Sequence, residues 1–167
     1  MATCETGRPV TVKTYETRVR WTGSTGLGWE HYDRAHVARA DPAKQELTVT
    51  TAEERGNPDH LNPEQLLLMA ASSCQMLWFL HLAAKARIDV VAYQDTCEAE
   101  MPQDRFTRLV LRPTITIEGD ADEARVLKLC EQAHRHCNIA KSLSCPVELE
   151  PRIAERCKKG LRPRFLR

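Results

Sequence analysis

Two cysteines of this chain lie in sequence contexts that suit thiol chemistry. Cys74 lies in the middle of a long apolar stretch, and Cys137 directly follows the basic run His134-Arg135-His136. A reactive thiol acts as its thiolate, and neighbouring positive charge stabilises that thiolate. The basic run could supply such charge, or it could form a solvated helix face. By its apolar surroundings alone, Cys74 is better explained as a small buried hydrophobic residue.

The cysteine count and the N-terminal residues bear on the redox state of these thiols. The chain holds seven cysteines in 167 residues, an odd number, so at least one thiol stays unpaired within the chain. The first residues, MATCETGRPV, lack the apolar core of a secretory signal. We therefore expect a cytoplasmic protein whose cysteines are reactive or buried thiols rather than structural disulfides.

Charge and hydropathy exclude several classes of protein. The net charge is +1, which argues against a nucleic-acid-binding protein driven by bulk charge. Residues 66–84 are largely apolar, close to the length of a membrane span. Ser72, Ser73, Gln75 and His81 interrupt this stretch, so we expect a buried helix and no membrane.

A metal site is a further reading of the segment around Cys137. His134, His136 and Cys137 are all ligand types, but positions two and three apart on a helix point around its axis. A tetrahedral site would need helix distortion or outside ligands. The chain has no CxxC, no Gly-rich phosphate loop, no GxSxG and no HExxH motif. We expect neither a bound metal nor a bound cofactor.

The elements that position these residues indicate an α+β fold, because strands come first, then a helix, further strands and a second helix. We expect a single domain over residues 1–167, with an N-terminal tail at 1–10 and a basic C-terminal tail at 154–167. The first strands form an antiparallel meander and lead into a polar loop. Their expected ranges are 11–21, 29–38 and 45–51, with the loop at 53–61.

A long helix is predicted to carry Cys74 and to end near Ala86. Asn62 is a good N-cap, Pro63 suits the first helical position, and Glu64 suits the positive end of the helix dipole. This helix is too apolar to lie on one sheet with a solvated back. The chain has little left to cover it, so we expect a dimer that buries two such helices.

The second half of the chain is predicted to hold two strands, a helix and a last strand, over 90–101, 107–118, 122–142 and 146–153. Pro113 lies inside the second of these strands and indicates an edge or a bulge. Asp120 or Asp122 is expected to cap the helix. Cys137 would then lie inside that helix.

Two motifs together resemble the OsmC/Ohr family of thiol peroxidases, and its OsmC-like branch most closely. The first is NPEQLL at 62–67, followed by the mid-helix Cys74, and the second is AHRHC at 133–137. Asn138 stands where relatives usually carry a proline. The resemblance covers residues 15–153 in the right order, with further matching segments at 142–143 and 146–149.

The resemblance implies a fold of antiparallel sheets with two central helices, assembled as an intertwined homodimer. It also implies a peroxidase in which Cys74 attacks an organic hydroperoxide and becomes a sulfenic acid. Cys137 would resolve that acid as a disulfide, with Cys130 or Cys145 as alternative resolving thiols. An external thiol or dithiol, such as a lipoyl group, would then reduce the disulfide.

The family also uses a Glu and an Arg at its thiolate. The Glu matches Glu64, and Arg34 is the first choice for the Arg, with Arg39 and Arg55 as alternatives. A thiol of ordinary pKa, about 8.5, is only a few per cent thiolate at neutral pH, and a contacting guanidinium shifts that balance. For Arg34, an ordinary surface charge on a strand is as good an explanation.

The spacing of Glu64 and Cys74 adds an inference about assembly. Ten residues of straight helix span about 15 Å, too far for one carboxylate to reach across. We therefore expect Glu64 to serve the partner subunit's thiol, in two composite sites at the dimer interface. Two other functions remain open: a redox-sensing or small-molecule-binding protein on the same fold, and a metal-binding protein.

Overall fold

The computed structural model describes residues 12–52 and 54–154. The chain divides into two compact units, the first ending at Pro63 and the second beginning at Glu64. The N-terminal tail expected at 1–10 and nearly all of the basic tail at 154–167 lie outside the described residues. The expectation of a single domain stays a prediction.

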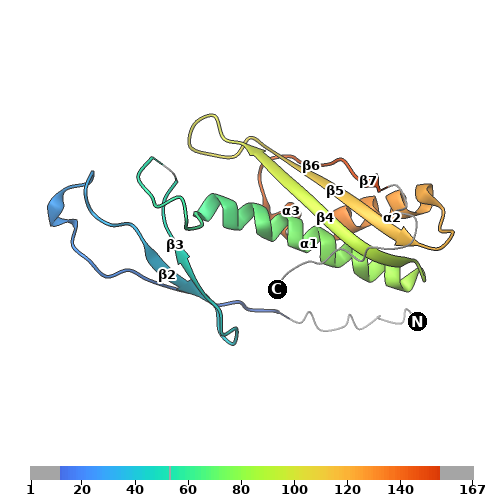
Figure 1. The fold of residues 1–167 in the computed structure, drawn as a ribbon, viewed down its shortest axis with the longest axis horizontal. Helices are drawn as coiled ribbons and strands as arrows, with labels where there is room; N and C mark the ends of the chain where they lie inside the picture. Colours follow the sequence, from blue (N-terminus) through green and yellow to red (C-terminus); the bar gives the residue numbers. More distant parts are fainter. Residues whose placement is uncertain (1–11, 53, 155–167) are drawn as a thin grey trace, which may run out of the picture. The chain divides into compact units, whose positions relative to one another are not determined.

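The first unit is built on a three-stranded antiparallel sheet in the order β1-β2-β3 (Figure 1). This confirms the predicted meander. Each strand is shorter than predicted, because residues 12–30 are exposed and bury no apolar face. Between β1 and β2 lies a single short 3₁₀ turn at Thr25–Leu27. The strands are β1 (Arg18–Arg20), β2 (His36–Arg39) and β3 (Glu46–Val49).

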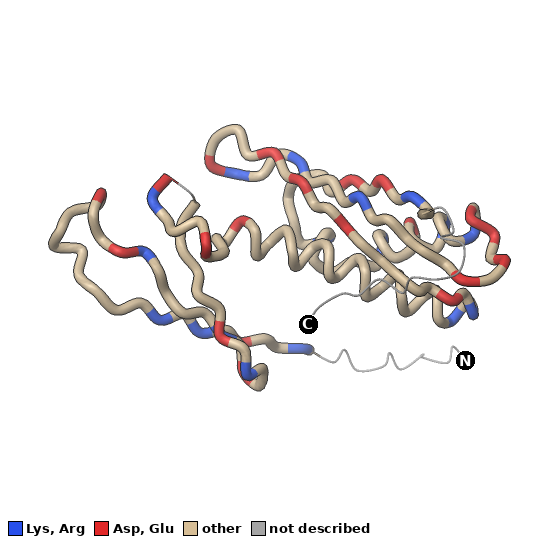
Figure 2. The backbone as a smooth tube through the Cα atoms, in the orientation of Figure 1, with Lys and Arg blue, Asp and Glu red and all other residues tan. Residues whose placement is uncertain are grey.

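The second unit begins with helix α1 (Pro63–Lys85), which starts where the sequence predicts. Its buried residues are Ala71, Gln75, Phe79 and Ala83, spaced four apart on one face. By length and composition alone α1 could cross a membrane, and 22% of its most apolar stretch is buried within this chain. Figure 2 shows that no charged residue lies between its two ends.

The sheet of the second unit packs one face against α1 and α2 (Figure 1). Strand β5 pairs antiparallel with β4 and parallel with β6 and β7. Phe79 of α1, Ile115 of β5 and Cys130 of α2 belong to the shared core. The elements are β4 (Asp89–Glu100), β5 (Arg108–Glu118), α2 (Glu123–His136), β6 (Val147–Leu149) and β7 (Arg152–Ile153).

Pro113 corrects the sequence prediction, because β5 is central in its sheet and its register with β4 is regular at Pro113. The Leu111 carbonyl accepts from the Glu150 N–H, and the Ile115 carbonyl accepts from the Ala154 N–H, each at 2.8 Å. Alternate residues of a strand direct their backbone N–H and C=O groups to the same edge. The backbone of Pro113 therefore faces the same edge of β5 as the backbones of Leu111 and Ile115. The missing N–H of Pro113 therefore lies at the break between β6 and β7, where the single predicted strand over 146–153 is interrupted.

The predicted helix over 122–142 is wrong at Cys137. Helix α2 begins after Asp122, whose carboxylate accepts from the Ala124 N–H at 3.1 Å, as a cap should. Cys137 has an extended backbone (φ −62°, ψ 110°) and separates α2 from the short helix α3 (Asn138–Ser142). Apolar residues continue past Cys137, so hydrophobic periodicity alone does not reveal the break.

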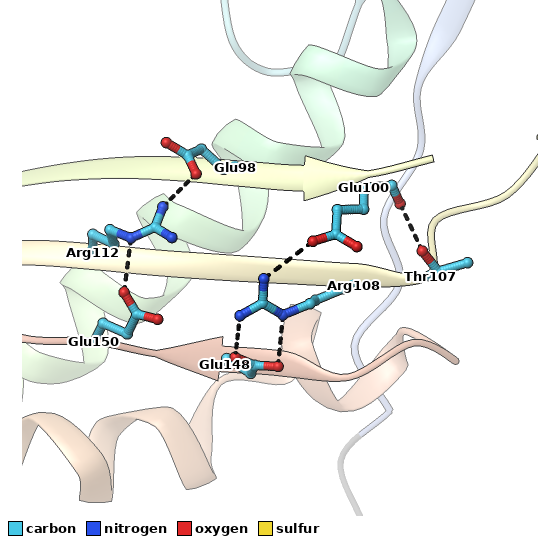
Figure 3. Close-up of polar contacts among 7 residues, drawn as sticks. All are labelled: Glu98, Glu100, Thr107, Arg108, Arg112, Glu148 and Glu150. Atoms are coloured by element: carbon cyan, nitrogen blue, oxygen red, sulfur yellow. Dashed lines mark hydrogen bonds and ion pairs between the residues drawn. The ribbon is translucent and has the colours of Figure 1, made fainter. Parts of the chain in front are cut away.

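The opposite face of the second sheet carries a charge array (Figure 3). Arg108 bridges Glu100 and Glu148, at 3.1 and 2.6 Å. Four residues further along β5, on the same face, Arg112 bridges two more carboxylates, Glu98 and Glu150, at 2.5 and 2.8 Å. These exposed ion pairs give the sheet its solvated face, so its helix-packed face is the one that bears on the thiol site.

Candidate functional site

The Cys74 and Cys137 side chains are neighbours in the second unit, close enough for Cys74 to raise the pKa of Cys137. Cys74 is half-buried near the middle of α1, whereas Cys137 is 0% exposed at the α2–α3 junction. Cys137 Sγ also lies 4.0 Å from the backbone oxygen of Ala71, one helical turn before Cys74. Both thiols are free. The two cysteines of the predicted pair are therefore brought together.

The environment of Cys137 favours its neutral thiol. Burial raises its pKa most, the neighbouring Cys74 raises it further, and the Ala140 and Ile139 N–H groups lower it, giving about 11. The Ala140 N–H donates to Cys137 Sγ at 3.4 Å, because Cys137 caps α3 in the manner of a serine. At neutral pH Cys137 therefore carries its proton, and it must lose that proton whenever it forms a bond through sulfur.

An aromatic contact flanks the thiol pair. Trp78 lies four residues after Cys74, on the same side of α1, and is half-buried. Its ring stacks on His136, the residue before Cys137, with centroids 5.1 Å apart, and meets His81 edge-on at 5.9 Å. The site therefore has an aromatic wall on the C-terminal side of Cys74.

The alternative resolving thiol Cys130 is held elsewhere in the core. Gln75 Nε2 donates to the Cys130 carbonyl oxygen at 3.0 Å and approaches its Sγ at 3.5 Å. Burial raises the pKa of Cys130 to about 11. Cys130 lies within α2, seven residues before Cys137. Cys145 packs against the core cluster that contains Ala71.

A buried polar cluster beside the thiols was missed by sequence reasoning. Ser72 Oγ donates to Asp95 Oδ2 at 2.5 Å, joining α1 to β4. Three buried oxygens of this cluster have no hydrogen-bond partner among the described residues: Gln75 Oε1, Tyr93 OH and Asp95 Oδ1. Burial, and then the charge of Asp95, raise the pKa of Tyr93 above its usual value. The sign of this cluster in the sequence was the pair of polar residues Ser72 and Gln75 inside an otherwise apolar helix.

Glu64 does not join the Cys74 site within this chain. It lies in the first turn of α1, as predicted, and ten residues of helix separate it from Cys74. Its Oε2 is buried and accepts no hydrogen bond among the described residues. A buried carboxylate oxygen without a partner is costly, so this position fits a role that the isolated chain does not complete.

Arg34 and Arg55 lie together in the first unit. They line a pocket of about 510 Å³ whose wall includes Trp29 and Glu54. The Arg55 guanidinium lies over the Trp29 ring at 3.7 Å. Arg34 donates to the backbone oxygens of Tyr32, at 3.0 Å, and of Trp29. Both guanidiniums thus face one cavity.

Arg39, the remaining alternative, is placed differently. It is exposed on β2 and pairs with Asp41 at 3.0 Å and Glu46 at 3.5 Å. Two carboxylates already neutralise its charge, so Arg39 is less suited than Arg34 or Arg55 to act on a thiolate. Which arginine takes this role stays a prediction.

The residues considered for a metal are also accounted for. His134 Nε2 lies 2.9 Å from the Val147 backbone oxygen, which ties α2 to β6. His136 stacks on Trp78, and Cys137 pairs with Cys74. Among residues 12–52 and 54–154, no group of three or more His, Cys, Asp or Glu side chains is arranged to hold a metal ion.

The fold and the paired thiols agree with what comparison with known proteins finds. The family model of the OsmC-like proteins matches residues 56–152, more than half of the chain. The chain belongs to the OsmC-like protein family. This confirms the resemblance and the α+β fold class with OsmC-like architecture. Because that fold is a soluble one, α1 is its core helix rather than a membrane span.

Individual relatives have diverged widely. The uncharacterized protein YmaD of Bacillus subtilis is 27% identical over 126 residues, covering 71% of this chain and 84% of that protein. An OsmC-like protein of unknown function from Vibrio cholerae has a solved structure with a TM-score of 0.73 and 25% identity, covering 86% of this chain and all of that one.

One solved structure carries a functional name. An organic hydroperoxide resistance protein of Elizabethkingia anophelis matches with a TM-score of 0.63 and 20% identity, covering 89% of this chain and 100% of that one. At this identity the match shows the fold alone.

Proposed function

We propose that the protein is a thiol-dependent hydroperoxide reductase that converts organic hydroperoxides to alcohols. The observation that carries the proposal is the contact between the half-buried Cys74 and the buried Cys137. Two neighbouring free thiols, one of them accessible, are what a dithiol peroxidase requires. Membership of a family that includes hydroperoxide resistance proteins supports the same reading.

In the first step the Cys74 thiolate attacks the distal oxygen of the hydroperoxide. The O–O bond breaks, the alkoxide takes a proton and leaves as an alcohol, and Cys74 becomes a sulfenic acid. The aromatic wall formed by Trp78 and His136 flanks the approach to Cys74. It offers an apolar surface to the organic group of the substrate.

In the second step Cys137 attacks the Cys74 sulfenic sulfur. The thiol proton of Cys137 and the sulfenic hydroxyl leave together as water, and a disulfide joins the two residues. Their existing contact makes this an intramolecular step with little rearrangement. An external thiol or dithiol, such as a lipoyl group, then returns both cysteines to thiols. No bound cofactor takes part.

The thiolate of Cys74 needs a cation, and we assign that role first to Arg34. Arg34 and Arg55 share one pocket, whereas Arg39 is paired with carboxylates. Glu64 would position the arginine or polarise the peroxide in the partner subunit's site, because it lies about 15 Å from Cys74 along its own helix. Its unpartnered buried oxygen supports this assignment.

A homodimer follows from this assignment and from the surface of α1. Met69 is 44% and Leu77 62% exposed, on a helix whose apolar stretch is mostly uncovered by its own chain. A second copy that covers this face would bury the apolar surface and bring Glu64 of the partner subunit to each thiol pair.

Peroxide consumption by the purified protein tests the proposal. Dithiothreitol or dihydrolipoamide supplies electrons, and tert-butyl hydroperoxide, cumene hydroperoxide and hydrogen peroxide are compared. We expect turnover that is lost in Cys74→Ser and a disulfide that is absent in Cys137→Ser. Cys97→Ser is the matched control and should retain turnover. A reduced wild-type protein without turnover would overturn the proposal and favour redox sensing.

A further inference from the structure

We infer that the external reductant attacks Cys74 Sγ and not Cys137 Sγ, so that the mixed disulfide forms on Cys74 and Cys137 is the leaving thiol. The inference rests on the proposed function for its physiological oxidant and names the step that returns the site to its reduced form. It follows from how differently the two sulfurs are enclosed.

Access decides which sulfur a thiolate can reach. Exchange proceeds by attack of a thiolate on one sulfur of the disulfide, and its rate depends on access to that sulfur. Cys137 is 0% exposed, with the Ala71 backbone oxygen at 4.0 Å and the Ala140 N–H at 3.4 Å from Sγ. Cys74 is only half-buried. An incoming thiol can therefore approach Cys74 and is screened from Cys137 by the protein.

The surroundings of Cys137 act in both directions on a leaving sulfur, because burial raises its pKa to about 11 while two N–H groups lower it. As the disulfide breaks, Cys137 holds the bonding electron pair as a thiolate inside the core, where burial disfavours charge. The N–H groups of Ala140 and Ile139 hydrogen-bond to this sulfur and offset part of that cost. A thiol of lower pKa leaves faster, so the burial of Cys137 opposes this order, the two donors reduce that penalty, and the access to Cys74 Sγ is what carries the inference. The helix break at Cys137 therefore places donors where negative charge develops.

A dithiol reductant reduces the disulfide in two successive exchanges. Its first thiolate bonds to Cys74 Sγ as the disulfide breaks, and Cys137 departs with the electron pair and takes up a proton. The second thiol of the reductant then attacks the reductant sulfur of the mixed disulfide, and Cys74 leaves as a thiolate. The dithiol is oxidised to a cyclic disulfide, and two electrons pass to Cys74 and Cys137.

This order also distinguishes dithiols from monothiols. In the mixed disulfide the freed Cys137 thiol still adjoins Cys74, so it can displace a monothiol and restore the protein disulfide. A dithiol completes the reduction intramolecularly before that reversal. A monothiol adduct should therefore build up only under a large excess of the monothiol, which allows it to be trapped.

The test maps the mixed disulfide directly. The full-length protein is oxidised with diamide, treated with excess glutathione, quenched in acid after short intervals, alkylated with N-ethylmaleimide and analysed by peptide mass spectrometry. We expect glutathione on the Cys74 peptide and the maleimide on the Cys137 peptide, in at least tenfold excess over the reverse. Equal amounts, or glutathione mainly on Cys137, would overturn the inference.

Diamide separates this inference from the proposed function. If diamide forms the Cys74–Cys137 disulfide and organic hydroperoxides do not, the peroxidase proposal fails while the mapping still decides the inference. If diamide forms no such disulfide, the inference itself fails. A Cys97→Ser variant is the control, because it removes a different half-buried thiol and should give the same map.

Discussion

Gln75, the residue after the candidate thiol Cys74, donates a hydrogen bond from Nε2 to the backbone oxygen of Cys130 at 3.0 Å. The bond joins α1 to α2 in the core, where Gln75 is 0% exposed. It is a specific constraint in an otherwise apolar interface. The position of Cys74 relative to the α2–α3 junction therefore depends on a side chain that takes no part in the proposed chemistry.

Substitution at Gln75 should separate polarity from packing. Gln75→Leu removes the bond together with the unpartnered Oε1, and such apolar replacements are close to neutral, so we expect a change within about 1 kcal/mol. Gln75→Glu buries an unpaired charge and should lower the free energy of unfolding by about 3 kcal/mol. Urea denaturation at pH 7 measures both. Equal stability of the two variants would contradict the burial of Gln75.

Stability should fall at alkaline pH because of buried thiols. Burial raises the pKa of Cys130 to about 11 in the folded protein, whereas the unfolded chain has the ordinary value. Below the ordinary value both states are protonated, and Cys130 contributes nothing to the pH dependence. From about pH 9 to pH 11 only the unfolded state ionises, so Cys130 alone should lower stability by roughly 3 kcal/mol.

Urea denaturation at pH values from 7 to 10.5 checks this slope. Cys130→Ala removes the ionisable group, so its stability, although lower throughout, should fall less steeply with pH than that of the wild type. Burial also raises the pKa of Cys97 and of Cys137 to about 11, so part of the slope should persist in the variant. Identical slopes in the two proteins would show that Cys130 does not titrate as its burial requires.

The exposed apolar face of α1 should control assembly. Leu77 is 62% exposed, and Leu77→Glu places a charge on the surface that we propose a second copy covers. We expect the protein to change from dimer to monomer, measured by sedimentation or light scattering. Ala124→Glu adds the same charge at an exposed position of α2 and should leave the dimer intact. A wild-type monomer would contradict the prediction outright.

Part of this architecture could be predicted from sequence because local rules agreed with the fold. The proline at position 63 and the apolar run after it fixed the start of α1, and Asp122 capped α2 as expected. The pairing of Cys74 with Cys137 was available only by resemblance, since 63 residues separate them in the chain. Long-range contacts of this kind leave no local pattern.

The failures have specific physical causes. Cys137 ends one helix and caps the next through its sulfur, a serine-like role that hydrophobic periodicity does not register. Pro113 lies in a central strand because the neighbouring strand is broken beside it, between Leu149 and Arg152, far along the chain. Asp95 and Tyr93 are paired with α1 only after β4 has folded against it.

The arginine that activates Cys74 can be identified from the rate at which Cys74 is alkylated at pH 7. An unassisted thiol is about 3% thiolate at pH 7, so loss of the activating cation should slow alkylation of Cys74 at that pH by up to about 30-fold. We expect this loss in Arg34→Met and little change in Arg39→Met, whose carboxylate partners already neutralise the charge. Iodoacetamide labelling, read at the Cys74 peptide by mass spectrometry, gives the rate.

Arg55→Met completes the comparison, because Arg55 lines the same pocket as Arg34 and lies directly over Trp29. A smaller loss of the Cys74 alkylation rate in Arg55→Met than in Arg34→Met would assign the activating cation to Arg34. The reverse order would transfer the role to Arg55, since both guanidiniums face the same cavity. An unchanged alkylation rate in all three variants would remove the arginine from the proposed mechanism.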